Sequence, residues 1–127
     1  MLKPTESELE ILQLLWEYGP LKVRQVNDLL NKHRSVGYTT TLKIMQIMAD
    51  KGLLSRDTDH RSHVYAPTLP SKEVQSTILD HILKTVFKGS RSNLVIQALG
   101  NHSASREELE EIRVLIDKMK AEEDGNL

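Results

Sequence analysis

The sequence predicts a mostly α-helical protein with one small β-hairpin. Several segments repeat apolar residues every three or four positions, which is the period of an α-helix that buries one face. Between residues 53 and 67 this pattern stops, and two short runs, LLSR and SHVYAP, flank DTDHR, whose Asp and Thr residues favour a turn. Aromatic residues make up only 4% of the chain, so the core is expected to consist of aliphatic side chains.

The first two helices are expected in PTESELEILQLLWEYGP and KVRQVNDLLNKH. Thr5 and Glu8 have the spacing of a capping box, in which each side chain binds the backbone N–H of the other residue. The leucines that follow form an apolar stripe, and Gly19 with Pro20 ends the first helix. In the second helix the valines and leucines are expected to face inward.

A third helix is expected in GYTTTLKIMQIMADKG, where Gly52 suits the left-handed position at a helix end. On a wheel with about 100° per residue, this helix has an inward and an outward face. The inward face holds Thr41, Ile44, Met45 and Met48. The outward face holds Thr39, Lys43, Gln46 and Asp50, and its neighbours are Thr40, Leu42 and Ile47.

Three short helices followed by a hairpin have the layout of a winged helix-turn-helix. We therefore predict a winged-helix DNA-binding domain over residues 1–69. The segment TLPS that follows the hairpin predicts a linker, and residues 70–127 predict a second, helical domain that serves for dimerisation.

The second domain is expected to contain three helices, two of which carry wide apolar stripes. The stripe residues are Val74, Ile78, Ile82, Val86, Leu109, Ile112 and Ile116. Helices of this length make a small core by themselves, so the stripes need a further surface. One interpretation packs them against the first domain. The other is a homodimer in which two C-terminal segments bury each other, and we prefer it because helix-turn-helix proteins usually bind two half-sites.

The middle of the chain is basic, although the formal net charge of the whole chain is only −1. Residues 22–61 carry eight Lys and Arg against four Asp, which favours an anionic partner. On the outward face of the third helix, the hydroxyls of Thr39 and Thr40 can donate to phosphate oxygens. Lys43 can reach guanine or phosphate, and Gln46 can bind adenine through two hydrogen bonds.

Two further residues, the apolar Ile47 and the hairpin residue Arg61, complete the predicted DNA-binding residues. Ile47 can meet a thymine methyl group. Arg61 at the hairpin tip can touch phosphate or enter the minor groove. The structural alternative is that Thr39 or Thr40 only caps the helix and that Lys43 is merely solvated. The hairpin that follows favours the DNA-binding interpretation.

GYTTTLKIMQIMADKGLLSR followed by HVYAP resembles the penicillinase-repressor family of bacterial transcriptional regulators (BlaI/MecI/CopY type). PTESELEILQLLWEYGP is similar to the first helix of that family, and FKGSRSNLVIQAL with SREELEEIRVLID is similar to its dimerisation segment. The resemblance implies a homodimeric repressor that binds a palindromic operator in double-stranded DNA. It places Thr39, Thr40, Lys43, Gln46, Ile47 and Arg61 at DNA-contacting positions. It also implies release by a signal from a membrane sensor-protease system, in an antibiotic or stress response.

The chain departs from the family pattern at three points. Copper-responsive members bind metal through C-terminal cysteine pairs, and this chain has no cysteine, which argues against that kind of copper sensor. Penicillinase-type members are cut at an Asn-Phe bond, and the corresponding pair here is Gln97-Ala98, so a protease with another preference, or none, remains open. Ile47 stands where many members have Arg, which removes a phosphate or base contact.

No cofactor, metal site or enzymatic activity is expected. The sequence shows no nucleophile–base set, no glycine-rich phosphate loop and no metalloprotease motif. His60 and His63 are three apart in the predicted hairpin and therefore point to opposite faces, and His81 is expected to be an ordinary surface or interface residue. Without a signal peptide or an apolar span, the chain is expected to be cytoplasmic and not inserted in a membrane. The alternative function is a winged-helix protein-interaction module without sequence-specific DNA binding.

Overall fold

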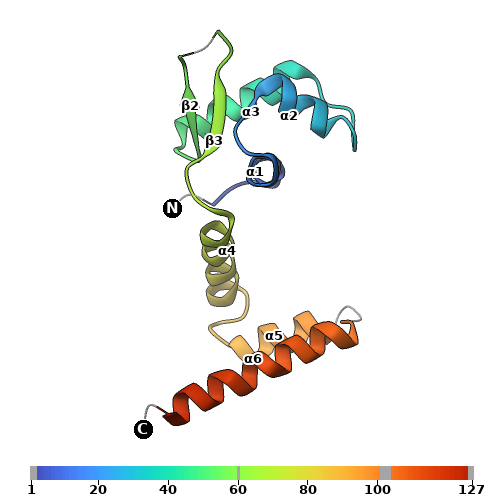
Figure 1. The fold of residues 1–127 in the computed structure, drawn as a ribbon, viewed down its shortest axis with the longest axis vertical. Helices are drawn as coiled ribbons and strands as arrows, with labels where there is room; N and C mark the ends of the chain where they lie inside the picture. Colours follow the sequence, from blue (N-terminus) through green and yellow to red (C-terminus); the bar gives the residue numbers. More distant parts are fainter. Residues whose placement is uncertain (1–2, 60, 101–103, 126–127) are drawn as a thin grey trace. The chain divides into compact units, whose positions relative to one another are not determined.

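The structure, a computed structural model, describes residues 3–59, 61–100 and 104–125. Within these residues the chain forms six helices and three strands (Figure 1). In chain order these are α1 (Glu6–Tyr18), β1 (Leu21–Lys22), α2 (Val23–Leu30), α3 (Tyr38–Asp50), β2 (Leu54–Asp57), β3 (Val64–Pro67), α4 (Ser71–Thr85), α5 (Arg91–Gly100) and α6 (Arg106–Gly125). The predicted fold class, mostly α-helical with a small β-hairpin, is confirmed.

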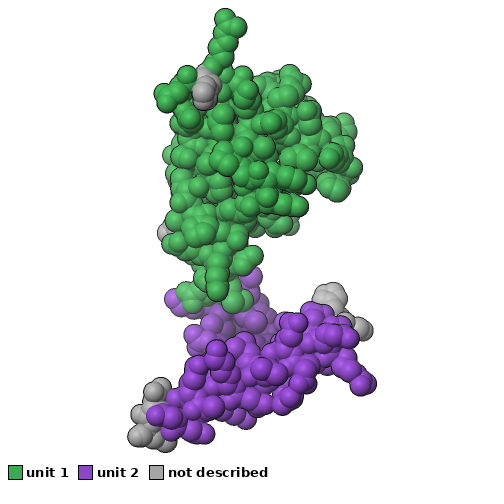
Figure 2. Space-filling view, in the orientation of Figure 1, with its two compact units in different colours: residues 1–80 green, residues 81–127 purple. Residues whose placement is uncertain are grey.

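The chain divides into two compact units, residues 1–80 and 81–127, which Figure 2 colours green and purple. The first unit contains α1 to β3, the second contains α5 and α6, and α4 contributes to both. In the first unit, α1, α2 and α3 followed by the β2–β3 hairpin form the predicted winged helix-turn-helix. The division into functional domains at residue 70 stays a prediction.

The first turn of α1 is fixed by the predicted capping box. The Thr5 hydroxyl accepts a hydrogen bond from the Glu8 N–H at 3.2 Å, and Oε1 of Glu8 accepts one from the Thr5 N–H at 2.8 Å. The Glu8 carboxylate also pairs with Nζ of Lys51 at 2.9 Å, which joins the start of α1 to the end of α3. The indole N–H of Trp16 donates to the Leu69 carbonyl at 2.9 Å and so ties α1 to the segment after the hairpin.

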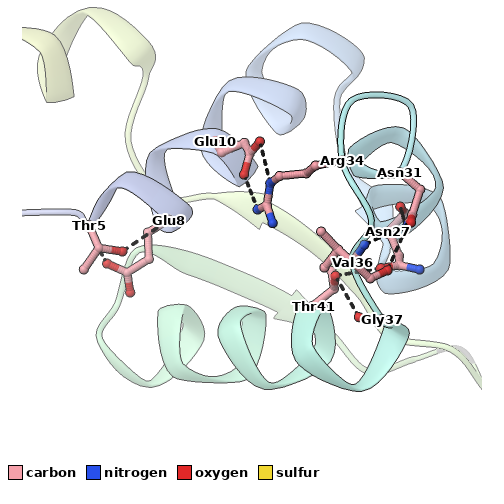
Figure 3. Close-up of polar contacts among 9 residues, drawn as sticks. All are labelled: Thr5, Glu8, Glu10, Asn27, Asn31, Arg34, Val36, Gly37 and Thr41. Atoms are coloured by element: carbon pink, nitrogen blue, oxygen red, sulfur yellow. Dashed lines mark hydrogen bonds and ion pairs between the residues drawn. The ribbon is translucent and has the colours of Figure 1, made fainter.

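The turn between α2 and α3 is held by two asparagines (Figure 3). Nδ2 of Asn31 donates to the carbonyls of Asn27 and Val36 at 2.7 and 2.8 Å, and its Oδ1 accepts from the Val36 N–H at 3.0 Å. The buried side chains of Asn27 and Thr41 are hydrogen-bonded at 2.8 Å. Because these bonds satisfy buried polar groups, they fix α3 at a defined angle to α2.

The core of the first unit is formed by side chains from α1, α2, α3 and the hairpin. Its members are Ile11, Leu12, Leu15, Val23, Val26, Leu30, Val36, Met45, Met48, Leu53, Leu54 and Tyr65. The expectation of an aliphatic core is met apart from Tyr65, which lies on the central strand and is only 1% exposed. A core shared by α1, α2, α3 and the hairpin holds the outward face of α3 on a rigid base.

The sheet contains one strand that the sequence did not reveal. β1 pairs with β3 antiparallel, so the sheet has the order β1-β3-β2. Leu21 lies opposite Tyr65 in this ladder, and Arg56 of β2 lies opposite Tyr65 on the other side. A two-residue strand is too short to show an alternating pattern, so only its ladder partner defines it.

The second unit exposes most of its apolar side chains. Neither α5 nor α6 contains a buried residue. The large hydrophobic residues exposed on these two helices are Val95, Ile96, Leu109, Val114, Leu115, Ile116 and Met119. The start of α6 is nonetheless well defined, because Ser105 and Glu108 form a second capping box. The helices are therefore formed, and within the described residues their large apolar side chains stay mostly exposed.

Candidate nucleic-acid interface

The structure places the two faces of α3 as the helical wheel predicts. Thr41, Met45 and Met48 are fully buried, at 0% exposure, and Ile44 is partly buried. The outward residues Thr39, Thr40, Lys43, Gln46 and Asp50 are all exposed. Ile47 is 41% exposed beside them, whereas Leu42 is partly buried and packs against the core. The outward face is thus polar, with one lysine and one aspartate, and has one apolar edge.

The start of α3 is not capped by a threonine. The N-cap residue is Gly37, which has no side chain to accept a hydrogen bond. Thr39 and Thr40 lie in the first turn, and their hydroxyls form no hydrogen bond to another described residue. The first backbone N–H groups of a helix have no intrahelical acceptor, so this end presents donors on the same side as the two hydroxyls. The structural alternative, a threonine cap, is wrong.

The hairpin adds two exposed arginine side chains to the surface of the first unit. Arg61 lies at the exposed tip between β2 and β3, and Arg56 is exposed on β2. Neither side chain forms a hydrogen bond or ion pair with another described residue. Asp57 accepts a hydrogen bond from the Asp59 N–H at 2.9 Å, so one of the two tip carboxylates shapes the turn. His60 lies outside the described residues.

Two of the eight basic residues in the 22–61 segment have structural roles. Arg34 pairs with Glu10 at 2.5 Å, and hydrogen bonding to this guanidinium lowers the pKa of the Glu10 carboxyl (Figure 3). Lys51 pairs with Glu8. Burial by itself raises the pKa of Glu8, but the Thr5 N–H and the Lys51 ammonium outweigh it and bring the pKa below its ordinary value. The basic residues without an ion pair to a described residue are Lys22, Arg24, Lys32, Lys43, Arg56 and Arg61.

An acidic groove on another part of the first unit offers a contrast. It has a volume of about 630 Å³ and lies between α1 and the end of α2. Its lining includes three glutamates, Glu6, Glu10 and Glu17, against the single arginine Arg34, together with His33 and apolar side chains. Carboxylates repel phosphate, so this groove is a poor surface for nucleic acid. The candidate interface is the outward face of α3 with the hairpin tip.

Sequence reasoning missed four residues that position this interface. Asn27 and Asn31 hold the turn before α3, and Arg24 lies over the ring of Tyr38 with 4.5 Å from its guanidinium carbon to the ring centroid. An Asn between inward-facing Val26 and Leu30 was a signal for a buried polar contact. The stacking of Arg24 on Tyr38 left no signal, since the two residues share no sequence pattern.

The predicted dimer residues differ in exposure. Val74 is buried at 1%, and Ile78, Ile82 and Ile112 are partly buried. Val86, Leu109 and Ile116 are exposed at 65, 47 and 45%. The predicted cleavage pair, Gln97 and Ala98, is exposed in the C-terminal half of α5, where Nε2 of Gln97 donates to Oδ1 of Asn93 at 3.0 Å.

The described part of the chain contains no candidate metal cluster and no candidate membrane span. No three His, Asp or Glu side chains gather there closely enough to hold a metal ion. His60 and His102 lie outside that part. None of its helices is long and apolar enough to cross a membrane.

Known proteins with similar sequences are bacterial regulators. "Transcriptional regulator BlaI" of Mycobacterium tuberculosis is 31% identical over 93 residues, which cover 72% of this chain and 67% of that protein. "Penicillinase repressor" of Bacillus licheniformis is 22% identical over 116 residues, or 91% of each chain. "Methicillin resistance regulatory protein MecI" of Mammaliicoccus sciuri is 18% identical over 114 residues, which cover 90% of this chain and 93% of that protein.

The fold also has a counterpart among solved structures. The crystal structure of the transcriptional regulator Tm0710 from Thermotoga maritima matches 97% of this chain and 78% of its own, with a TM-score of 0.51 at 20% identity. The family model described as "Penicillinase repressor" matches residues 4–118. A family of repressors is not one of enzymes, so the prediction that the chain is not an enzyme is confirmed. The winged helix, the exposed face of α3 and a match over nearly the whole sequence agree, and the chain belongs to the penicillinase repressor family.

Proposed function

We propose that this chain is a homodimeric, DNA-binding transcriptional repressor that binds a palindromic operator through the α3 helices of its two subunits. The observation that carries the proposal is the outward face of α3, where Thr39, Lys43 and Gln46 are exposed opposite an inner face whose Thr41, Met45 and Met48 are fully buried. A helix held so by its core presents its polar side chains to the DNA major groove in one orientation. Half-sites are then spaced by one turn of DNA, about 34 Å.

Each residue of this face has a distinct task. The hydroxyls of Thr39 and Thr40, next to the open N–H groups of the first turn, donate to phosphate oxygens and set the register. Lys43 contacts phosphate or guanine, and Gln46 binds the edge of one adenine. Ile47, 41% exposed in the free protein, covers a thymine methyl group. Arg61 of the wing contacts the neighbouring backbone or minor groove.

The dimer forms through the C-terminal helices. Val86, Leu109 and Ile116 are exposed in the single chain, and burying them against a second copy removes this apolar surface from water. Ile78, Ile82 and Ile112 are partly buried and can add less area to this interface. Val74 is already buried within its own chain, so it supports α4 and does not add area to the interface.

Release of the operator is coupled to a membrane sensor-protease system that responds to an antibiotic or another stress. The proposed cut between Gln97 and Ala98 falls within α5, which has no buried residue and so opens locally at low cost. Cleavage there separates α6 from the rest of the chain and weakens the dimer. The repressor acts on chromosomal DNA, so we place it in the cytoplasm.

The test has two steps. Genomic fragments bound by the purified protein are selected and sequenced, and binding to the recovered operator is then titrated with salt. A repressor that neutralises phosphates loses affinity steeply, with about one unit of log–log slope per phosphate. No binding at low salt would reject the repressor and leave the alternative, a winged-helix protein-interaction module.

Two substitutions test the assignment of α3 within the same assay. Lys43→Ala is expected to weaken binding to all sequences and to lower the salt slope. Gln46→Ala is expected to relax the preference at one base position, at a cost of roughly 1–3 kcal/mol. If both variants keep the affinity and the base preference of the unchanged protein, α3 is not the recognition helix.

A further inference from the structure

We propose that Arg24 binds a phosphate of the operator backbone and that Tyr38 holds its guanidinium in position to do so. The inference rests on the proposed function and adds two residues to it that no sequence pattern marks. The guanidinium carbon of Arg24 lies 4.5 Å from the centroid of the Tyr38 ring, which is a cation–π contact.

The contact joins the two helices of the helix-turn-helix at the proposed DNA face. Arg24 is the second residue of α2, and Tyr38 is the first residue of α3. Tyr38 directly precedes Thr39 and Thr40, so the guanidinium lies next to the start of the outward face of α3. In a helix-turn-helix the first of the two helices crosses the DNA backbone, and α2 is that helix.

Arg24 differs from Arg34 and Arg113 in having no carboxylate partner among the described residues. Arg34 is paired with Glu10, and Arg113 is paired with both Glu110 and Asp117. A paired guanidinium has its donors occupied. The Arg24 guanidinium instead lies over the Tyr38 ring, a contact that uses none of its N–H groups in a hydrogen bond to a carboxylate and leaves them available for the two oxygens of a phosphate.

The stack also lowers the cost of binding. A free arginine side chain loses rotamer freedom when a phosphate orders it, and this loss subtracts from affinity. Tyr38 is 38% exposed, so its ring is partly covered and partly accessible to solvent. With the guanidinium already resting on this ring, part of the ordering precedes DNA binding. Tyr38 is therefore a positioning residue that acts through Arg24.

A double-mutant cycle on the selected operator, titrated with salt, tests both roles. Arg24→Ala is expected to weaken binding roughly tenfold near 0.15 M salt and to lower the log–log slope by about 0.9, the value for one phosphate. Tyr38→Leu is expected to weaken binding about two- to fivefold, as for an exposed cation–π contact. Tyr38→Phe keeps the ring and should bind like the unchanged protein. The double variant should bind no more weakly than Arg24→Ala alone.

Two further variants guard against trivial explanations. Lys120→Ala removes an exposed cation of α6 and controls for the change in net charge. Arg24→Lys keeps the charge but loses the planar stacking, so it should retain the salt slope while losing affinity, whether or not Tyr38→Leu folds normally. Unfolding followed by the fluorescence of the single tryptophan, Trp16, shows whether each variant is folded.

The outcomes separate this inference from the proposed function. If the unchanged protein shows no salt-dependent operator binding, the proposed function itself fails. If it binds but Arg24→Ala keeps both affinity and slope, the phosphate role of Arg24 is wrong. If Tyr38→Leu weakens the Arg24→Ala protein as much as it weakens the unchanged one, Tyr38 does not act through Arg24.

Discussion

In residues 1–80, apolar side chains from three helices and a hairpin enclose one another, whereas α5 and α6 of residues 81–127 bury none of theirs. Val26, Met45 and Met48 of the first unit are at 0% exposure. Ile96 and Met119 of the second unit are 67 and 59% exposed. The same chain thus contains one unit with a closed core and one whose apolar faces are open.

This difference separates two kinds of task. A unit with a closed core holds α3 rigidly without help, which suits a surface that must match the spacing of base edges. A unit with exposed apolar faces gains stability when another surface covers them, which suits a contact between subunits. Under the proposed function, the first unit binds the operator and the second unit joins two subunits into a dimer.

The largest expected effect comes from truncating a leucine in each unit. Leu12 of α1 is 2% exposed, so Leu12→Ala should lower the free energy of unfolding of the first unit by about 2–5 kcal/mol. Leu115 of α6 is 55% exposed, so Leu115→Ala should leave that unfolding transition unchanged. Urea titration followed by Trp16 fluorescence measures the first unit, because Trp16 lies on α1. Equal losses for both variants would contradict the contrast between the units.

The next effect concerns the dimer. Ile116→Asp puts a charge on the exposed apolar face of α6, and its burial against a second copy is costly. We expect monomers in sedimentation and roughly 10²-fold weaker operator binding. In a dimer, binding of one DNA-binding unit raises the effective concentration of the other at its half-site, and a monomer loses this gain. Lys118→Asp, an exposed polar position on the same helix, is the matched control and should stay dimeric. A dimeric Ile116→Asp protein would refute the proposed interface.

The smallest expected effect is the loss of unfolding free energy when an ion pair is removed, and each unit offers one such pair for comparison. Glu8 is 3% exposed and paired with Lys51, so Glu8→Gln should cost about 1 kcal/mol at pH 7. The folded pKa of Glu8 is below its unfolded value, so this stabilisation is present above the unfolded pKa, about 4.3, and is lost as the pH falls through the folded pKa.

The difference in urea midpoint between the unchanged protein and Glu8→Gln should therefore shrink in acid. Glu110→Gln is the control, since Glu110 pairs with Arg113 at a fully solvated position of α6. Its pKa is also lowered by that hydrogen bond, yet an exposed pair should not change the Trp16-monitored stability. A pH-independent difference for Glu8→Gln would show that its charge does not stabilise the first unit.

Much of the fold was predictable because its signals are local. The capping box of Thr5 and Glu8, the helical stripes and the left-handed Gly52, with φ of 83°, each depend on residues a few positions apart. The faces of α3 also followed from its own period, which separated Thr41 from Thr39. By contrast, β1 has no pattern of its own and exists only because β3 pairs with it.

The sequence by itself determined that a short turn is followed by a helix, and that this helix has Lys43 and Gln46 on one side and Met45 and Met48 on the other. Both features depend on residues only a few positions apart, because the helical period and the turn preferences are local. Only the tertiary structure decided which cations remain free. Arg34 forms an ion pair with Glu10, and Lys51 forms one with Glu8. Arg24 instead lies over the ring of Tyr38. The physical reason is that a side chain's partner depends on distances across the fold, which spacing along the chain does not encode.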